Sequence, residues 1–186
     1  RGSTFFTTIC QKGIQIHDSG AISFRPSGAI GLTAKRIIKR EQFWNKWHSL
    51  AQGFLQGAAF YQNNGLYRLA VYLLHQAAQH CYCGVLRVMV GYRTNAQSLD
   101  RLLCLIDTSA PHLSLALPRQ SAEDDRLVEL LSKGYTDARY KDAFNASEEQ
   151  VAALIDRISV MIDVADRQCR LRIQQLKANG IPYIAD

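Results

Sequence analysis

The feature that most constrains this chain is a helical spacing of apolar side chains that continues from Thr33 to Lys177. Turn-forming residues divide this region at 63–65, at 91–95 and in the proline-containing segment 109–119. The predicted helices cover 33–63, 66–90, 97–106, 121–140 and 147–177. Because mostly short connections join them, the sequence predicts an all-α fold, an antiparallel bundle of four long helices plus one short helix.

Residues typical of helix N-termini stand where several of these helices are predicted to begin. Thr33 can cap the first helix, and Ser121 with the acidic residues after it opens the fourth. Ser147 and Gln150 have the spacing of a capping box at the start of the last helix. The predicted core-facing stripe of the first helix is Phe43, Trp47, Leu50, Phe54, Ala58 and Tyr61.

The first thirty-odd residues differ in character from the rest. Apolar residues at helical spacing in 5–9 and an alternating stretch in 14–17 predict one short helix and one strand, which cannot close a core by themselves. We therefore expect this segment to be the end of a domain that begins upstream. The predicted divisions are an N-terminal remnant over 1–20, a linker over 21–32, the helical bundle over 33–177 and a C-terminal tail over 178–186.

Composition narrows the classes of function. Apolar residues make up 47% of the 186 and charged residues 20%, which is typical of a soluble folded protein. No stretch approaches the roughly 20 apolar residues of a spanning helix, and the N-terminus lacks an export leader, so we expect a cytoplasmic protein without membrane contact. The 22 Lys and Arg exceed the 16 Asp and Glu, which favours an anionic partner such as a nucleotide or nucleic acid. The five cysteines form no C-x-x-C pair and predict free thiols rather than a metal site.

Two segments carry the polar groups from which a site could be built. In 130–141, Tyr135 and Arg139 are four residues apart and therefore neighbours on one helix face, as are Asp137 and Lys141. An Arg beside an aromatic ring can contact a phosphate while the ring stacks on a base. The alternative, which the residues alone leave open and even favour, is that the tyrosines are packing residues and the charges are solvated or paired.

The second segment, 70–80, alternates polar groups with a closely packing face of Ala and Leu. His75 and Gln79 lie one helical turn apart, as do Gln76 and His80. A lone histidine on such a helix is more often part of a hydrogen-bonded structure than a ligand.

Together the two segments resemble the HEPN domain, a family of helical bundles. The likeness is carried by "AVYLLHQAAQHCYCGVL" and "LVELLSKGYTDARYKDAF" and covers roughly Glu41 to Arg170. More narrowly, the chain resembles the HEPN half of bacterial proteins that fuse a nucleotidyltransferase domain to a HEPN domain. In those proteins a segment similar to "FFTTICQKGIQIHDSG" closes the transferase.

This resemblance implies a homodimer that associates with a nucleotide, such as ATP, or with RNA, and that assists a nucleotidyltransferase domain mostly absent from this chain. The chain has no Gly-Ser turn followed by Asp-x-Asp, so Mg²⁺ and transferase catalysis would belong to the upstream domain. No cofactor is expected in the chain itself. The predicted nucleotide-binding residues have three roles. Phosphate contact is assigned to Arg139, Lys141 and Arg87, and stacking or hydroxyl contact to Tyr135 and Tyr140. Polar support is assigned to His75, Gln76 and Asp137.

Many HEPN members are metal-independent ribonucleases whose motif is an Arg followed by a polar residue and, after four to six residues, a His. Here Tyr140 follows Arg139, and 141–147 contains no His that could act as a general acid or base. Arg68 and His75 match the spacing, but they lie on the predicted apolar helix 66–90 and not at the motif position of the family. We therefore predict no catalytic residues. The alternatives are a HEPN-type ribonuclease or toxin component, and a dimerisation scaffold without a ligand.

A basic stripe lies at the start of the first long helix. Lys35, Arg36, Lys39 and Arg40 are spaced so that they share one helix face. The stripe could meet a phosphate backbone, an acidic domain upstream or only water, and the sequence favours the last two.

Overall fold

The computed structural model describes residue 16 and residues 34–91, 93–94, 96–111, 113 and 117–178. The predicted transferase remnant and linker, apart from Ile16, and the tail beyond Ala178 lie outside these residues, as does the predicted cap Thr33. The described part contains six helices and no strand. Their bounds are α2 Ala34–Asn63, α3 Tyr67–Met89, α4 Leu99–Ser109, α5 Ala122–Lys133, α6 Asp137–Tyr140 and α7 Glu148–Ala178.

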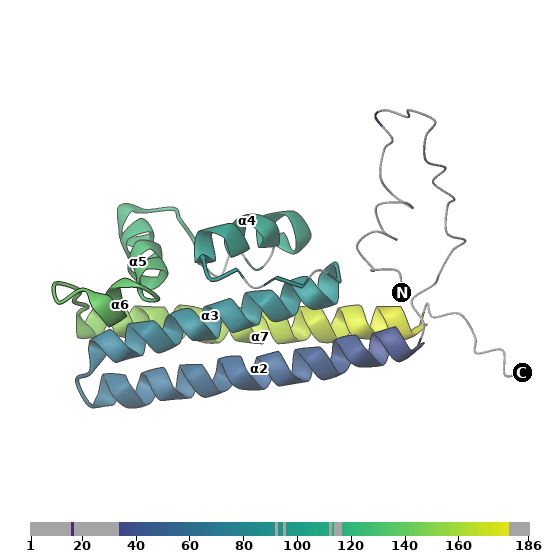
Figure 1. Cartoon of the computed structure of the whole chain (residues 1–186), viewed down its shortest axis with the longest axis horizontal. Coiled ribbons are helices and arrows are strands. Elements are labelled where there is room, and N and C mark those ends of the chain that lie inside the picture. Colours follow the sequence, from purple (N-terminus) through teal and green to yellow (C-terminus); the bar gives the residue numbers. More distant parts are fainter. Residues whose placement is uncertain are drawn as a thin grey trace, which may run out of the picture.

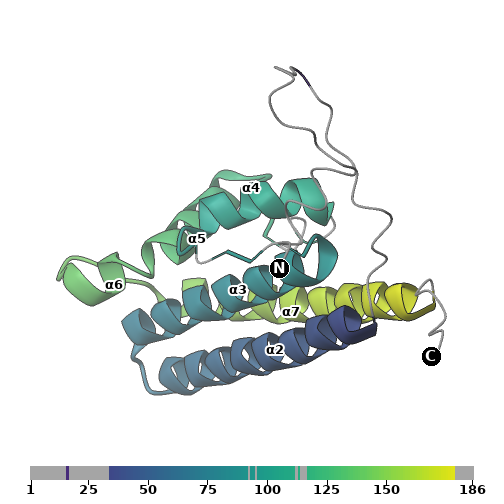
Figure 2. The same cartoon turned by 45° about the vertical axis from the view of Figure 1, so that its right-hand side comes forward.

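The three long helices α2, α3 and α7 lie side by side, and α4, α5 and α6 form a second layer beside α3 (Figures 1 and 2). α2 is antiparallel to α3, whereas α7 runs in the same direction as α3. The predicted all-α bundle is confirmed, but it is not antiparallel throughout, because the chain returns between α3 and α7 through α4, α5 and α6.

The predicted fourth helix is interrupted in the structure. We expected one long helix over 121–140, but α5 has 12 residues and α6 only 4, so the bundle has three long helices rather than four. The interruption begins at Gly134, where an added Cβ would lie 3.0 Å from the Cγ1 and carbonyl oxygen of Val71. The close approach of this turn to α3 ends α5 and sets α6 off as a separate element.

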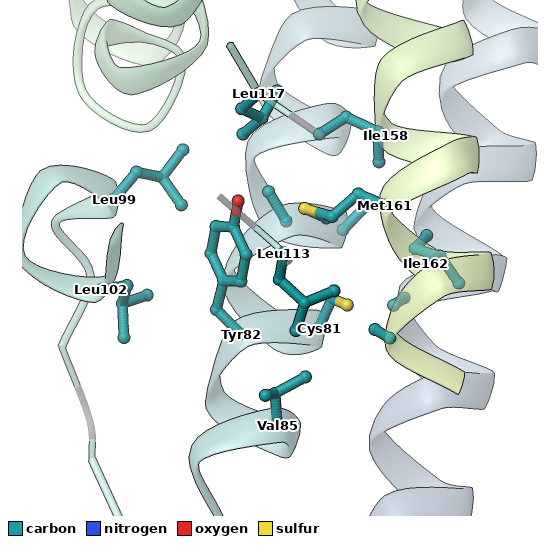
Figure 3. Close-up of a cluster of buried hydrophobic side chains, with 14 of the residues drawn as sticks. Cys81, Tyr82, Val85, Leu99, Leu102, Leu113, Leu117, Ile158, Met161 and Ile162 are labelled. Atoms are coloured by element: carbon teal, nitrogen blue, oxygen red, sulfur yellow. The ribbon is translucent and has the colours of Figure 1, made fainter. Parts of the chain in front are cut away.

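The core is centred on α3, which is buried over most of its circumference. Tyr82 is fully buried among apolar side chains of α4, the 110–117 segment and α7, including Leu102, Leu113 and Met161 (Figure 3). On α2 the predicted stripe was shifted: Leu50 is 40% exposed, and Phe43, Trp47, Phe54 and Tyr61 are half-buried. Of the predicted stripe only Ala58 is buried, and the other buried apolar residues of α2 are Ile37, Trp44 and Ala51. The small alanines let the neighbouring helices approach closely.

Polar contacts join the helices at their edges. The indole Nε1 of Trp44 donates to Asp166 at 2.8 Å, linking α2 to α7. Ser121 accepts from the backbone N–H of Asp124, and the Asp124 carboxylate receives Arg157 of α7 at 2.6 Å. The predicted side-chain cap of α5 is thereby confirmed, and Ser147 and Gln150 form the predicted capping box.

Within the described residues, none of the helices combines the length and the apolar character needed to cross a membrane. The four cysteines there are free thiols, as predicted, with Cys81, Cys83 and Cys169 buried and Cys104 exposed.

Candidate functional site

Arg139 lies among three tyrosine rings at the end of the bundle that holds α6. Its guanidinium carbon is 4.1 Å from the ring centroid of Tyr135, 4.8 Å from that of Tyr140 and 5.7 Å from that of Tyr72 on α3. These distances are typical of cation–π contacts. We call Arg139, Tyr72, Tyr135 and Tyr140 the arginine–tyrosine cluster. Tyr72 was not among the predicted site residues, because sequence spacing on one helix cannot show which residue of another helix packs beside it.

Two hydrogen bonds to backbone carbonyls hold this cluster in place. The Nε of Arg139 donates to the carbonyl of Tyr135 at 2.6 Å, which confirms that residues four apart here are neighbours. Arg68 of α3 donates to the carbonyl of Ala138, so a side chain ties α6 to the long helix. Arg139 has no carboxylate partner within the part of the chain that the structure describes, and Tyr140 is 75% exposed. The guanidinium is therefore positioned but not neutralised by an ion pair.

Beneath the cluster lies a buried histidine. The ring of His75 stacks on that of Tyr135, with centroids 5.3 Å apart and planes 30° apart, and His75 is 1% exposed. Burial is the main reason that the pKa of His75 falls to about 4; the positive charge of Arg139 contributes to the lowering, and a hydrogen bond with the backbone of Gln97 opposes it. The Nδ1 of His75 lies 3.3 Å from the side-chain nitrogen of Gln76. The backbone carbonyl of Gln76 is hydrogen-bonded to the Nδ1 of His80 at 2.8 Å. At neutral pH His75 is thus an uncharged support for Tyr135.

Asp137 and Lys141 face a different part of the surface. They form the predicted pair, with Lys141 Nζ 2.9 Å from the Asp137 carboxylate, and this hydrogen bond holds the pKa of Asp137 below its ordinary value. Both line a hollow of about 430 Å³, and Arg139 does not. The residues lining the hollow are Arg126, Glu129, Leu130, Lys133, Asp137, Lys141, Ala143, Phe144, Asn145 and Gln150. Its cations are already paired, because Lys133 bonds Glu129, Arg126 lies 3.6 Å from Glu123, and Lys141 bonds Asp137.

Arg87 is not brought together with the other predicted site residues. It lies in the last turn of α3, where its Nη1 donates to the carbonyl of Gly91 and its guanidinium sits 5.5 Å from the ring centroid of Phe43. Arg87 lies fifteen positions after Tyr72 on α3, which is roughly 22 Å along a helix. The structure therefore joins Arg139, Tyr135, Tyr140, His75 and Gln76, but places Arg87 at the opposite end of the bundle (Figure 1).

No group of three or more His, Cys, Asp or Glu side chains among the described residues is arranged to hold a metal ion. The chemistry that the arginine–tyrosine cluster offers is anion contact by a fixed guanidinium beside an exposed aromatic face.

Comparison with known proteins identifies the family of this chain. A search of curated proteins found no match. Among solved structures, the chain is similar to an archaeal HEPN homologue, ST0689, with 21% sequence identity and a TM-score of 0.47 over 68% of this chain and 97% of the other. The model of the HEPN domain family matches residues 44–168, which include α3 to α6 and most of α2 and α7. The chain therefore belongs to the HEPN domain family.

Proposed function

We propose that this HEPN domain binds a nucleotide through the arginine–tyrosine cluster and is not itself catalytic. The observation that carries the proposal is the state of Arg139, which is fixed over tyrosine rings yet has no carboxylate partner among the described residues. A guanidinium held in this way loses little side-chain entropy when it binds a phosphate.

The parts of the cluster would have different roles. The Nη groups of Arg139 would contact phosphate oxygens, because its Nε is occupied by the Tyr135 carbonyl. Tyr140, which is the most exposed ring, would stack on the base. Tyr135, with His75 beneath it, would keep the guanidinium in position.

The ribonuclease alternative has less support in this geometry. His75 contacts the same tyrosine as Arg139, but it is buried and neutral, whereas a general acid or base must reach the proton that it transfers. Incubation of the pure protein with RNA, beside an Arg139→Ala variant, tests this alternative, because cleavage that the variant loses would contradict a non-catalytic role.

The finer role, assistance to a nucleotidyltransferase domain, rests on the resemblance to fused proteins. A domain that holds a nucleotide near a transferase would raise the local concentration of its substrate or product. The upstream sequence tests this part, since a Gly-Ser turn with an Asp-x-Asp pair within one domain length is expected.

Titration calorimetry with ATP, GTP and a short RNA tests the binding itself. We expect saturable binding of at least one of them and an affinity about tenfold lower in Arg139→Ala, from the loss of a charge-assisted contact. The matched control is Arg119→Ala, which removes an exposed arginine that pairs with Asp100. The absence of heat from all three ligands at high micromolar protein would contradict the proposal. So would an Arg139→Ala variant that changes association or stability but no ligand affinity, which would favour the scaffold alternative.

A further inference from the structure

Four arginines gather at the opposite end of the bundle, where α2 begins and α3 and α7 end. They are Arg36, Arg40, Arg87 and Arg172, and we call them the arginine quartet. Arg40 is 9% exposed, and the other three are half-buried. Burial lowers the pKa of Arg40, and the positive charges of Arg172, Arg87 and Arg36 lower it further. Like charges therefore lie near one another here and disfavour the charged form of Arg40.

Two members of the quartet are held by backbone carbonyls of the α3 C-terminus. Arg40 Nη1 donates to the carbonyl of Val88 at 2.7 Å, and Arg87 Nη1 donates to that of Gly91 at 2.9 Å. The Arg87 guanidinium also lies over the ring of Phe43, which stacks on Trp47 with centroids 5.3 Å apart. These contacts fix the guanidinium groups without neutralising their charge.

Counter-charges do not balance the quartet. None of its arginines forms an ion pair within the described residues. The acidic groups on the neighbouring turns are already used, because Glu41 pairs with Lys177 at 2.8 Å and Asp166 pairs with Arg170 at 2.8 Å.

Helix dipoles explain only part of this arrangement. The negative end of α3 favours Arg40 and Arg87, but Arg36 lies in the first turn of α2, where the positive end of the helix disfavours a cation. No acidic residue occupies that turn, and Lys35 and Lys39 add further positive charge. The start of α2 therefore concentrates cations against its own dipole, which a bound anion would compensate.

We propose that the arginine quartet binds an oligophosphate, a chain of phosphate groups that is either free or the backbone of a short nucleic acid. Guanidinium forks suit phosphate oxygens, and four guanidinium groups at one end of the bundle, two of them held by backbone carbonyls, suit several adjacent phosphates. The site is separate from the arginine–tyrosine cluster and does not depend on the function proposed above.

Tryptophan fluorescence provides a local signal, because the only two tryptophans, Trp44 and Trp47, lie on α2 beside the quartet. Inorganic tripolyphosphate and a 5′-phosphorylated tetranucleotide are titrated at low salt into the wild type and into Arg36→Gln/Arg172→Gln. Neither substituted side chain makes a hydrogen bond or ion pair within the described residues, so the variant should keep its thermal unfolding midpoint. We expect saturable binding by the wild type that weakens with added salt, and an affinity about tenfold lower per arginine removed.

The matched control Arg101→Gln/Arg119→Gln removes the same charge from α4 and the loop before α5 and should bind like the wild type. Tripolyphosphate that binds as tightly as the tetranucleotide supports a site for free oligophosphate, whereas a clear preference for the tetranucleotide supports a backbone site. Equal loss of affinity in both double variants, or equal binding of poly-glutamate, would overturn the proposal in favour of general or protein-directed charge attraction. Unchanged tripolyphosphate affinity in Arg139→Ala distinguishes this site from the nucleotide site.

Discussion

Tyr135 links the interior of the protein to its surface, because its ring contacts buried His75 and also exposed Arg139. The neutral state of His75 is part of that link. A protonated imidazole in this position would be desolvated and would lie beside the charge of Arg139. The candidate site therefore includes a buried histidine that supports Tyr135 without facing the surface.

The burial of His75 predicts a specific loss of stability in acid. Its pKa is about 4 in the folded state and near the ordinary value of 6.5 in the unfolded state. Between these values the unfolded chain binds a proton that the folded chain does not, so the free energy of unfolding falls as pH falls from 6.5 to 4, by up to about 3 kcal/mol. Urea unfolding of the wild type and of His75→Gln at pH 7, 6, 5 and 4.5 measures this.

The comparison between the two proteins isolates the histidine. Carboxylates whose pKa is lowered, such as Asp124 and Asp137, also lose stabilising contacts in acid, but they are common to both proteins. We expect His75→Gln to lose less stability than the wild type between pH 6.5 and 4.5. An identical pH dependence would show that His75 is not buried in the neutral form.

At the scale of elements, the contact of Gly134 with α3 places the candidate site. A Cβ at Gly134 would meet the backbone and side chain of Val71 at 3.0 Å, so the turn before α6 would have to move away from α3. We expect Gly134→Ala to cost about 1–3 kcal/mol of unfolding free energy, in the range of an overpacked core. Chemical denaturation measures this cost.

Gly53 provides the matched control on α2. An added Cβ there meets nothing within 4 Å, so Gly53→Ala should stabilise the helix by about 0.5–1 kcal/mol. If both substitutions shift stability in the same direction, the close approach at Gly134 is not what positions α6.

The sequence predicted the elements better than it predicted their interruptions. The bounds of α2, α3 and α7 follow from apolar periodicity, turn residues and the Ser147 capping box, which are local signals. The break between α5 and α6 does not follow from local signals, because a single glycine in an otherwise helical stretch is compatible with one continuous helix. The break is explained by the close contact of Gly134 with Val71, which is a tertiary effect.

For the candidate site too, the sequence predicted the contacts within one helix but not those between helices. Pairs four residues apart, Tyr135 with Arg139 and Asp137 with Lys141, are neighbours as expected. The packing of α6 decides which of these pairs lies beside Tyr72 and which lines the hollow. The direction of α3 decides where Arg87 lies. Spacing along the sequence shows neither the packing of α6 nor the direction of α3.

At the scale of the whole molecule, two positively charged features lie at opposite ends of α3. The arginine–tyrosine cluster is at its first half and the arginine quartet at its C-terminal turn. Arginines without an ion-pair partner among the described residues therefore lie at two separate places.

We also expect a homodimer, and exposed apolar residues near the α2–α3 turn offer a contact surface. Phe60 is 62% exposed, Leu66 48% and Leu69 42%. Leu69→Glu should weaken the dimer, since a charge would be buried in the contact. Val160→Glu on α7, which changes a residue that is 55% exposed, is the control. Sedimentation that shows a monomeric wild type, or an equal effect of the two substitutions, would contradict this surface.

Photolabelling tests the central claim, nucleotide binding at Arg139, most directly. The wild type is irradiated with 8-azido-ATP at low salt, with excess ATP as the competitor, and the modified peptides are identified by mass spectrometry. We predict competed labelling within 135–141, with Tyr140 as the main modified residue, and its loss in Arg139→Ala. Labelling confined to the peptides that contain Arg36, Arg87 or Arg172, or labelling that excess ATP does not reduce, would contradict it.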